Sequence, residues 1–238
     1  MVANPASFVA ALTADGPVSG AWDESRATAR ADFEAWTAPR TNPGDIQMCE
    51  IMGWLDDNLP ADTIYTNGAG NFTVWLHRFH KYRDFGTQVA PICGSMGYGI
   101  PAALAAAFAR PDATVICIAG DGDFQMTCTE LATACAHGLK VRILIVNNGM
   151  LGTIRMHQER HFPGRVSGTT LVQGNPDFTA FAKSYGAYAE RVEKTADFAA
   201  AFARADAHDG PAVLELMIDP EALTPAMTLT QIRDAAQA

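Results

Sequence analysis

The chain has 238 residues, of which 48% are hydrophobic, enough to bury the core of one substantial domain with room for an appendage. Its formal net charge of -9 argues against a nucleic-acid-binding surface, although backbone N–H groups and a metal ion can still hold an anionic cofactor. No apolar run approaches a membrane span and the N-terminus has no signal pattern, so we expect no membrane contact. Five cysteines without CxxC spacing favour reduced thiols in a cytoplasmic protein.

The first 44 residues are rich in Ala, Asp, Thr and Pro and end in a run of helix breakers at 38–44. Within them, the pattern predicts one helix over residues 24–36. We therefore assign residues 1–44 to a linker, residues 45–225 to the main domain and residues 226–238 to a C-terminal tail.

From residue 46 onward, helices and strands are predicted to alternate. The first helix should run from Ile46 to about Asp57. Alternation of this kind is typical of an α/β fold with a doubly wound, mostly parallel sheet sandwiched by helices. Strands are expected near residues 63, 114, 142, 187 and 213.

The clearest βαβ unit lies at the centre of the chain. Residues 113–119 and 141–146 are apolar runs that predict buried parallel strands. Residues 128–137 predict the helix that connects them. No such strand is apparent before the glycine-rich segment 94–99, which argues against an unrelated nucleotide-binding domain with a glycine-rich fingerprint.

Polar residues follow both central strands. Gly120, Asp121 and Gly122 come directly after the first strand, and Asn147 and Asn148 come directly after the second. Because the carboxyl ends of neighbouring parallel strands meet at one edge of a sheet, these residues should lie together. Each motif alone would also suit an ordinary turn. Their pairing favours a site for Mg²⁺ that carries a phosphate.

At this spacing the chain resembles the thiamine diphosphate enzymes, whose diphosphate-binding domain carries GDG and then NN after one βαβ unit. It is similar to the C-terminal cofactor domain of the acetolactate synthase-like group over residues 45 to about 225. The resemblance implies the thiamine diphosphate-binding fold, with thiamine diphosphate and Mg²⁺ as cofactors. It also implies that Asp121, Asn148 and the backbone carbonyl of Met150 hold the metal.

The same resemblance implies how the diphosphate is held. The loop at 66–71 takes the place of a family segment that contacts the diphosphate through the side chain matched here by Asn71. It would also suit a plain polar loop between a strand and a helix. Phe72 stands where acetolactate synthases often have histidine, so we expect one phosphate contact to be missing. The implied diphosphate contacts are Gly70, Asn71, Gly120, Gly122, Asp123, Leu151 and Gly152.

Residue 123 is commonly small and hydroxylated in relatives, but it is Asp123 here. A carboxylate beside a diphosphate costs Coulomb energy. We therefore expect Asp123 to turn toward solvent or to cap the helix that starts there, and we favour the cap.

The segment at 94–101 is similar to the family segment that receives the aminopyrimidine ring. Met96 matches the large apolar side chain that wedges beneath the thiazolium and bends the cofactor. Gly94 matches the residue whose carbonyl accepts a hydrogen bond from the exocyclic amine, and Ser95 lies between them. A core methionine would be the commoner explanation of Met96 alone, but its position between two glycines disfavours that explanation.

A polar helix is predicted over residues 153–161, after the segment at 148–152 that matches the metal loop of the family. His157 stands where acetolactate synthases usually have a tryptophan that shapes the pocket for the second 2-oxo acid, which counts against that exact activity. His157 is a candidate acid/base residue beside the substrate. It is equally explained, with His161, as a solvated helix residue.

The resemblance implies a lyase or transferase that decarboxylates or ligates small 2-oxo acids. Family members take an activating glutamate from a pyrimidine-binding domain, usually on a neighbouring subunit, and this chain has no room for that domain. We therefore expect a homo-oligomer of a longer enzyme, or a split 2-oxo acid decarboxylase with a pyrimidine-domain partner chain. A non-catalytic thiamine diphosphate-binding or assembly module is the alternative.

Overall fold

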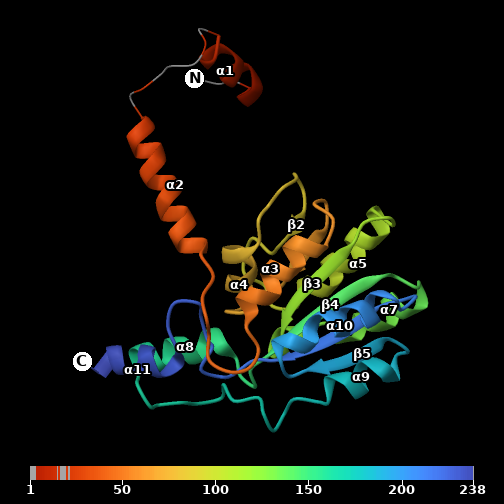
Figure 1. Ribbon diagram of the computed structural model, residues 1–238. Coiled ribbons are helices and arrows are strands. Elements are labelled where there is room, and N and C mark those ends of the chain that lie inside the picture. Colours follow the sequence, from red (N-terminus) through yellow and green to blue (C-terminus); the bar gives the residue numbers. More distant parts are fainter. Residues whose placement is uncertain (1–3, 15, 17–19, 21, 238) are drawn as a thin grey trace. The chain divides into compact units, whose positions relative to one another are not determined.

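The computed structural model describes residues 4–14, 16, 20 and 22–237, and its contacts divide the chain into two compact units. The smaller unit, Met1–Ala38, contains α1 (Pro5–Leu12) and α2 (Asp23–Thr37), and α2 confirms the helix predicted over 24–36. The larger unit, Pro39–Ala238, contains the sheet (Figure 1). No helix in the described ranges is both long and apolar enough to cross a membrane.

The larger unit is built on a six-stranded sheet in which all neighbouring strands run parallel. The strands lie in the order β2-β1-β3-β4-β6-β5. After β2 the chain therefore passes back beyond β1 to form β3, which opens a crevice at the carboxyl ends of β1 and β3. The strands are β1 Ile64–Asn67, β2 Gln88–Val89, β3 Val115–Gly120, β4 Val141–Asn147, β5 Tyr188–Val192 and β6 Ala212–Met217.

The predicted α/β class and its five strands are confirmed, and one strand was missed. The two-residue strand β2 precedes the segment at 94–99, so the expectation that no strand lies before that segment is wrong. The signal was absent because two residues, Gln88 and Val89, are too few to show any hydrophobic period.

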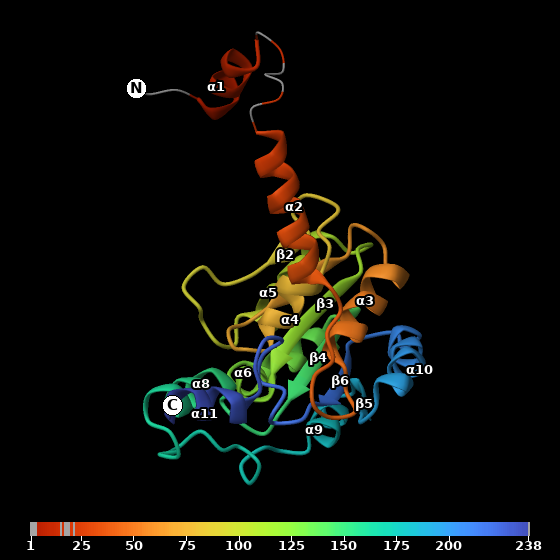
Figure 2. The ribbon, with the colours of Figure 1, turned by 60° about the vertical axis from the view of Figure 1, so that its left-hand side comes forward.

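Helices cover the sheet in two layers (Figures 1 and 2). The side chains of the central strands alternate between these layers. Ile116 and Leu144 belong to one buried cluster, and Cys117 and Ile143 belong to the other. Every residue of β3 and β4 is buried, as expected for strands covered on both faces. One layer contains α3 (Met48–Asn58), α4 (Thr73–Phe79) and α10 (Thr195–Asp206), and the other contains α5 (Gly99–Ala109), α7 (Leu131–Ala136) and α9 (Phe178–Ser184).

The connection from β3 to β4 is more broken than the single helix predicted over 128–137. It contains α6 (Asp121–Gln125), a 3₁₀ turn at Cys128–Glu130, and then α7. Thr127 leaves the helical conformation, with φ -140° and ψ 21°, and its hydroxyl donates to the carbonyl of Gly97 at 2.7 Å. This contact bends the chain between α6 and α7 and ties it to the glycine-rich segment.

The C-terminal helix α11 (Leu229–Gln237) packs on α8 (Gly152–His161), the helix predicted over 153–161 (Figure 1). Arg233 donates to both carboxylate oxygens of Glu159, at 2.8 and 2.9 Å. These hydrogen bonds hold the pKa of Glu159 well below its usual range, although the side chain is only 1% exposed. Beside them, a small buried cluster joins the two helices and contains Met150, Leu223, Leu229 and Ile232.

Candidate cofactor site

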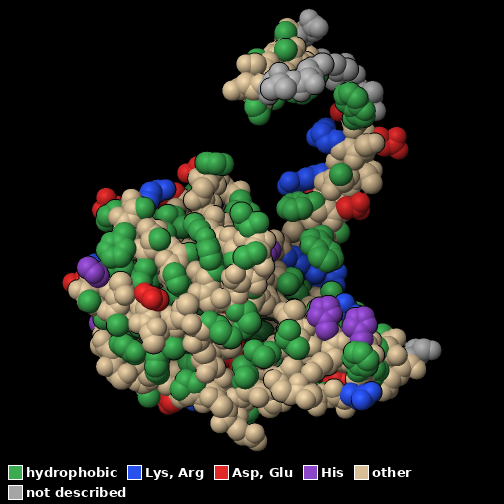
Figure 3. Space-filling model, turned by 180° about the vertical axis from the view of Figure 1, so that it is seen from behind, with side chains coloured by type: hydrophobic (Ala, Val, Ile, Leu, Met, Phe, Trp, Pro, Cys, Tyr) green, Lys and Arg blue, Asp and Glu red, His purple; other side chains and the backbone are tan. Residues whose placement is uncertain are grey.

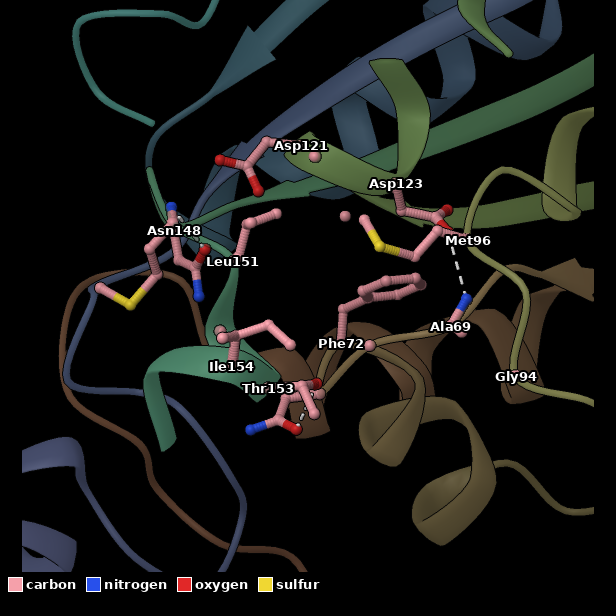
Figure 4. Close-up of a pocket in the computed structure, with 16 residues that line it drawn as sticks. Ala69, Phe72, Gly94, Met96, Asp121, Asp123, Asn148, Leu151, Thr153 and Ile154 are labelled. Atoms are coloured by element: carbon pink, nitrogen blue, oxygen red, sulfur yellow. Dashed lines mark hydrogen bonds between the residues drawn. The ribbon is translucent and has the colours of Figure 1, made fainter. Parts of the chain in front are cut away.

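A cavity of about 220 Å³ opens at the carboxyl ends of β1, β3 and β4. The loops that follow these three strands line it, together with the segment around Met96 (Figure 4). This is the edge at which parallel α/β sheets bind ligands. The lining residues are Ala69, Gly70, Asn71, Phe72, Gly94, Met96, Gly120, Asp121, Gly122, Asp123, Asn148, Met150, Leu151, Gly152, Thr153 and Ile154.

Every residue predicted to bind the cofactor lines this cavity except Ser95. Ser95 is exposed, and its Oγ lies 3.0 Å from Sγ of Cys93. Ala69, Thr153 and Ile154 also line the cavity and were not predicted to bind the cofactor. Each lies within two positions of a predicted residue. The correct loops were therefore predicted, but each predicted loop was too short.

Asp121 begins α6 immediately after β3 and is 2% exposed. Asn175 donates from Nδ2 to Oδ2 of Asp121 at 2.8 Å. Burial raises the pKa of the Asp121 carboxyl, and the hydrogen bond from Asn175 acts in the opposite direction. The side chain of Asp121 lies at the same end of the cavity as Asn148 (Figure 4). The predicted meeting of these two residues at one sheet edge is therefore observed.

The two consecutive asparagines have different surroundings. Asn147 is 7% exposed and donates from Nδ2 to Oε1 of Glu215 at 2.7 Å. Asn148 lines the cavity, and its Oδ1 accepts from the backbone N–H of Met150 at 3.2 Å. Between them and Met150, Gly149 adopts φ 68°, a conformation that favours glycine. Asn147 is thus fixed within the sheet edge, while Asn148 remains available to a ligand.

The chemistry of these groups suits Mg²⁺ that arrives with a diphosphate. In the described part of the chain, no three His, Cys, Asp or Glu side chains gather in a metal-binding arrangement. Mg²⁺ needs only one or two carboxylates when phosphate oxygens and water fill its other positions. Gly152 lies close to Asn148, since a Cβ at residue 152 would come within 3.2 Å of Nδ2 of Asn148. Without a side chain, residue 152 leaves its backbone accessible beside that amide. One buried carboxylate and one amide beside bare backbone therefore fit the predicted ion.

The prediction that Asp123 turns outward or caps the helix is wrong. The side chain is 3% exposed, and its Oδ1 accepts from the backbone N–H groups of Gly97 at 2.8 Å and Ala69 at 3.1 Å. The helix begins two residues earlier, at Asp121, so Asp123 lies inside its first turn. Gly68 makes room, because a Cβ there would lie 1.9 Å from Oδ1 of Asp123. Burial raises the pKa of Asp123 to about 6.

Phe72 points into the cavity (Figure 4). A Cβ on either Gly70 or Gly120 would lie 2.7 Å from the Phe72 ring, so both glycines are needed for this placement. The neighbouring Asn71 is held by α8, since Thr153 donates from its hydroxyl to Oδ1 of Asn71 at 2.8 Å. The loop after β1 therefore presents one ordered amide and one apolar ring to the cavity.

Met96 reaches the cavity from a turn with a glycine on each side (Figure 4). Gly94 and Gly97 have φ of 69° and 77°, which places both in the left-handed region. Met96 is 38% exposed, so it does not fill a gap in the core. This rules out the simple explanation of Met96 as a core methionine.

His157 does not line the cavity. It is exposed on α8, and its ring is stacked with that of His161 at a centroid distance of 6.0 Å. The cavity is lined instead by the start of α8, at Gly152, Thr153 and Ile154.

Residues 68–216 match the family model for the thiamine pyrophosphate enzyme C-terminal TPP binding domain. The chain is 35% identical over 202 residues to the acetolactate synthase isozyme 2 large subunit of Escherichia coli (strain K12), covering 83% of this chain and 36% of that protein. It is 36% identical over 196 residues to the probable acetolactate synthase large subunit of Methanococcus aeolicus, covering 79% of this chain and 32% of that protein.

A solved structure shows the same relationship. The thiamine diphosphate-dependent 4-hydroxybenzoylformate decarboxylase of Rhodococcus jostii RHA1 matches with a TM-score of 0.69 and 28% identity, over 75% of this chain and 34% of that one. The chain spans about a third of the length of the curated relatives named above. The matched region contains all the loops of the cavity after β1, β3 and β4. The chain therefore belongs to the family of thiamine pyrophosphate enzyme C-terminal TPP-binding domains.

Proposed function

We propose that this chain provides the diphosphate and Mg²⁺ site of an acetolactate synthase-like enzyme that decarboxylates or ligates small 2-oxo acids. One observation carries the proposal: a single cavity joins a buried carboxylate, an amide side chain and glycine-rich backbone from three strand ends. Bound thiamine diphosphate supplies carbanion stabilisation at the reacting carbon, and the protein orients it.

In this proposal, Asp121, Asn148 and the carbonyl of Met150 hold Mg²⁺. Met96 supports the bent cofactor, and the carbonyl of Gly94, with Ser95 beside it, contacts the pyrimidine. The diphosphate is held by the residues at the starts of α4, α6 and α8. They are Gly70, Asn71, Gly120, Gly122, Asp123, Leu151 and Gly152.

We also propose His157 as an acid/base residue on the substrate side of the site. It lies four residues after Thr153 on α8, so both residues share one face of the helix. Thr153 lines the cavity. A substrate that extends from the cavity along this face would reach His157.

We propose that the complete enzyme adds a pyrimidine-binding domain, from a second copy or from a separate partner chain. In this arrangement, residues 1–44 are the tail of a preceding domain and residues 45–225 are the cofactor domain. The C-terminal tail, residues 226–238, packs back on that domain through α11. One face of the larger unit carries many hydrophobic and few charged side chains (Figure 3). Large apolar side chains are exposed along the segment before α5, namely Tyr82, Phe85, Ile92 and Tyr98. Exposed apolar surface of this kind supports a protein partner.

A cytoplasmic location is part of the same proposal. The five cysteines are free thiols. Free thiols are typical of proteins kept in a reducing compartment.

The test is isothermal titration of thiamine diphosphate into the chain, with and without Mg²⁺. We expect binding that requires Mg²⁺ and disappears in Asp121→Ala. Asp112→Ala is the matched control, because Asp112 is exposed just before β3, at the opposite edge of the sheet. Binding that ignores Mg²⁺, or that survives in Asp121→Ala, contradicts the proposal.

A second step separates an enzyme from a non-catalytic module. The loaded chain is mixed with a pyrimidine-domain protein, and decarboxylation of pyruvate and other 2-oxo acids is followed. Product formation supports the enzyme. Binding without turnover of any 2-oxo acid favours the non-catalytic binding or assembly module.

A further inference from the structure

Asn175 lies in the loop between α8 and α9, far along the chain from the metal-binding residues, and it contacts Asp121 directly. Its Nδ2 donates to Oδ2 of Asp121 at 2.8 Å. Its Oδ1 accepts from Nε2 of Gln125 at 2.9 Å. A flipped amide would place two acceptors against each other at Asp121 and two donors at Gln125. The two contacts therefore fix Asn175 as a donor to the carboxylate.

The amide of Asn175 also connects to a buried chain of polar groups. Its Nδ2 lies 3.4 Å from Oδ1 of Asn147, and Asn147 donates to Glu215 at 2.7 Å. The second oxygen of Glu215 accepts from Nε of Arg191 at 2.8 Å. Asn147 and Glu215 are 7% and 1% exposed. These contacts cross from β4 to β6 and β5, so the support behind Asp121 is part of the rigid sheet.

The backbone around Asn175 is restrained as well. Pro176 follows it, which disfavours helical conformations at Asn175. Asp177 then caps α9 by accepting from the N–H groups of Thr179 and Ala180, each at 3.0 Å. The asparagine is thus presented from a fixed point immediately before a helix.

Asn175 lines a second cavity, next to the segment Asn147–Gly149. This cavity, of about 430 Å³, is lined by Asn147, Asn148 and Asn175 among others. Asn148 lines both cavities. Asp121 lines the first cavity but not the second, and Asn175 lines the second but not the first, so their hydrogen bond lies between the two cavities.

We propose that Asn175 is a positioning residue for the metal site. It holds one oxygen of Asp121, so that the carboxylate keeps a fixed orientation beside the cofactor cavity. It also joins α6 to the end of β4. The inference rests on the proposed function, in which Asp121 binds Mg²⁺. Groups that hydrogen-bond a metal ligand typically change metal affinity by about 10–100-fold when they are removed.

The first experiment measures the Mg²⁺ concentration that gives half-maximal binding of thiamine diphosphate by calorimetry. Asn175→Ala should raise this concentration by roughly tenfold or more. At saturating Mg²⁺, the affinity for thiamine diphosphate should change much less, whereas general damage to the site would weaken both. Gln173→Ala is the matched control, since Gln173 is exposed in the same loop. An unchanged Mg²⁺ requirement in Asn175→Ala overturns the proposal.

Gln125→Ala provides a second variant if Asn175→Ala does not fold. It removes the hydrogen bond that orients the Asn175 amide, while Asn175 itself remains. The Mg²⁺ requirement should rise in the same direction by a smaller factor. A requirement equal to that of the wild type overturns the proposal here too.

A second experiment keeps this inference separate from the proposed function. Urea unfolding is measured without Mg²⁺ or cofactor for Asp121→Ala, Asn175→Ala and the double variant. The shifts in midpoint should be non-additive, because the two side chains share one hydrogen bond. Additive shifts overturn the inference. If the wild-type chain binds no thiamine diphosphate, the proposed function fails, and the unfolding cycle still decides whether Asn175 holds Asp121.

Discussion

Two carboxylates in the first turn of α6 are supported in opposite ways. Asp121 is held by a side chain, Asn175, which belongs to a network across β4, β6 and β5. Asp123 is held by backbone N–H groups of Ala69 and Gly97, and it joins the loop after β1 to the glycine-rich turn. We therefore expect changes at Asp121 to affect metal binding and changes at Asp123 to affect the stability of the chain.

The largest effect on stability should come from Gly68→Ala. The new Cβ would lie 1.9 Å from Oδ1 of Asp123, which must move and break its hydrogen bonds. We expect a loss of about 3 kcal/mol in the free energy of unfolding, measured in urea. Gly53→Ala is the control, because nothing lies within 4 Å of its Cβ position. In the double variant Gly68→Ala with Asp123→Ala, the clash should vanish, and a purely additive loss would contradict this account.

An effect of similar size should appear in the pH dependence of stability. Burial raises the pKa of Asp123 to about 6 in the folded chain, above its usual value of 3.8. The folded state therefore binds more protons between these values, and stability should fall as pH rises through that window. Relative to Asp123→Asn, which keeps an acceptor for both N–H groups and cannot ionise, the wild type should lose about 3 kcal/mol of stability across this window. Parallel pH profiles for the two proteins would exclude a buried, ionising Asp123.

The smallest effect should come from Phe72→His, which replaces an apolar ring in the cavity with a hydrogen-bond donor. Binding of thiamine diphosphate with Mg²⁺ should tighten by about 1 kcal/mol, measured by calorimetry. Phe85→His is the control, since Phe85 is 99% exposed and does not line the cavity. Equal or weaker binding would mean that residue 72 does not face the diphosphate.

The end of the cavity at Asp121 and Asn148 could be predicted from the sequence, because strong local signals set its position. Two apolar runs fix β3 and β4, and parallel pairing alone brings Asp121 and Asn148 to one edge. The other side was read less well. The direction of Asp123 depends on where α6 begins and on the space left by Gly68, and neither has a local signal.

Long-range contacts were not predictable either. Asn175 lies 54 positions from Asp121 and was not predicted to belong to the site. An asparagine followed by a proline is common in ordinary turns and gives no sign of a distant contact. Likewise, nothing local indicated that Asn147 would bond to Glu215 while Asn148 faces the cavity. Such choices between neighbouring side chains are made by tertiary contacts.

The packing of α11 on α8 has a consequence for where this domain ends. The matched family region stops at residue 216, but Leu229 and Ile232 of α11 pack in the same buried cluster as Met150, which lines the cavity. A protein shortened to the matched region would expose that cluster and leave Glu159 without Arg233. The folding unit is thus longer than the segment that sequence similarity defines. Its last helix, α11, supports the part of the cavity wall formed by Met150.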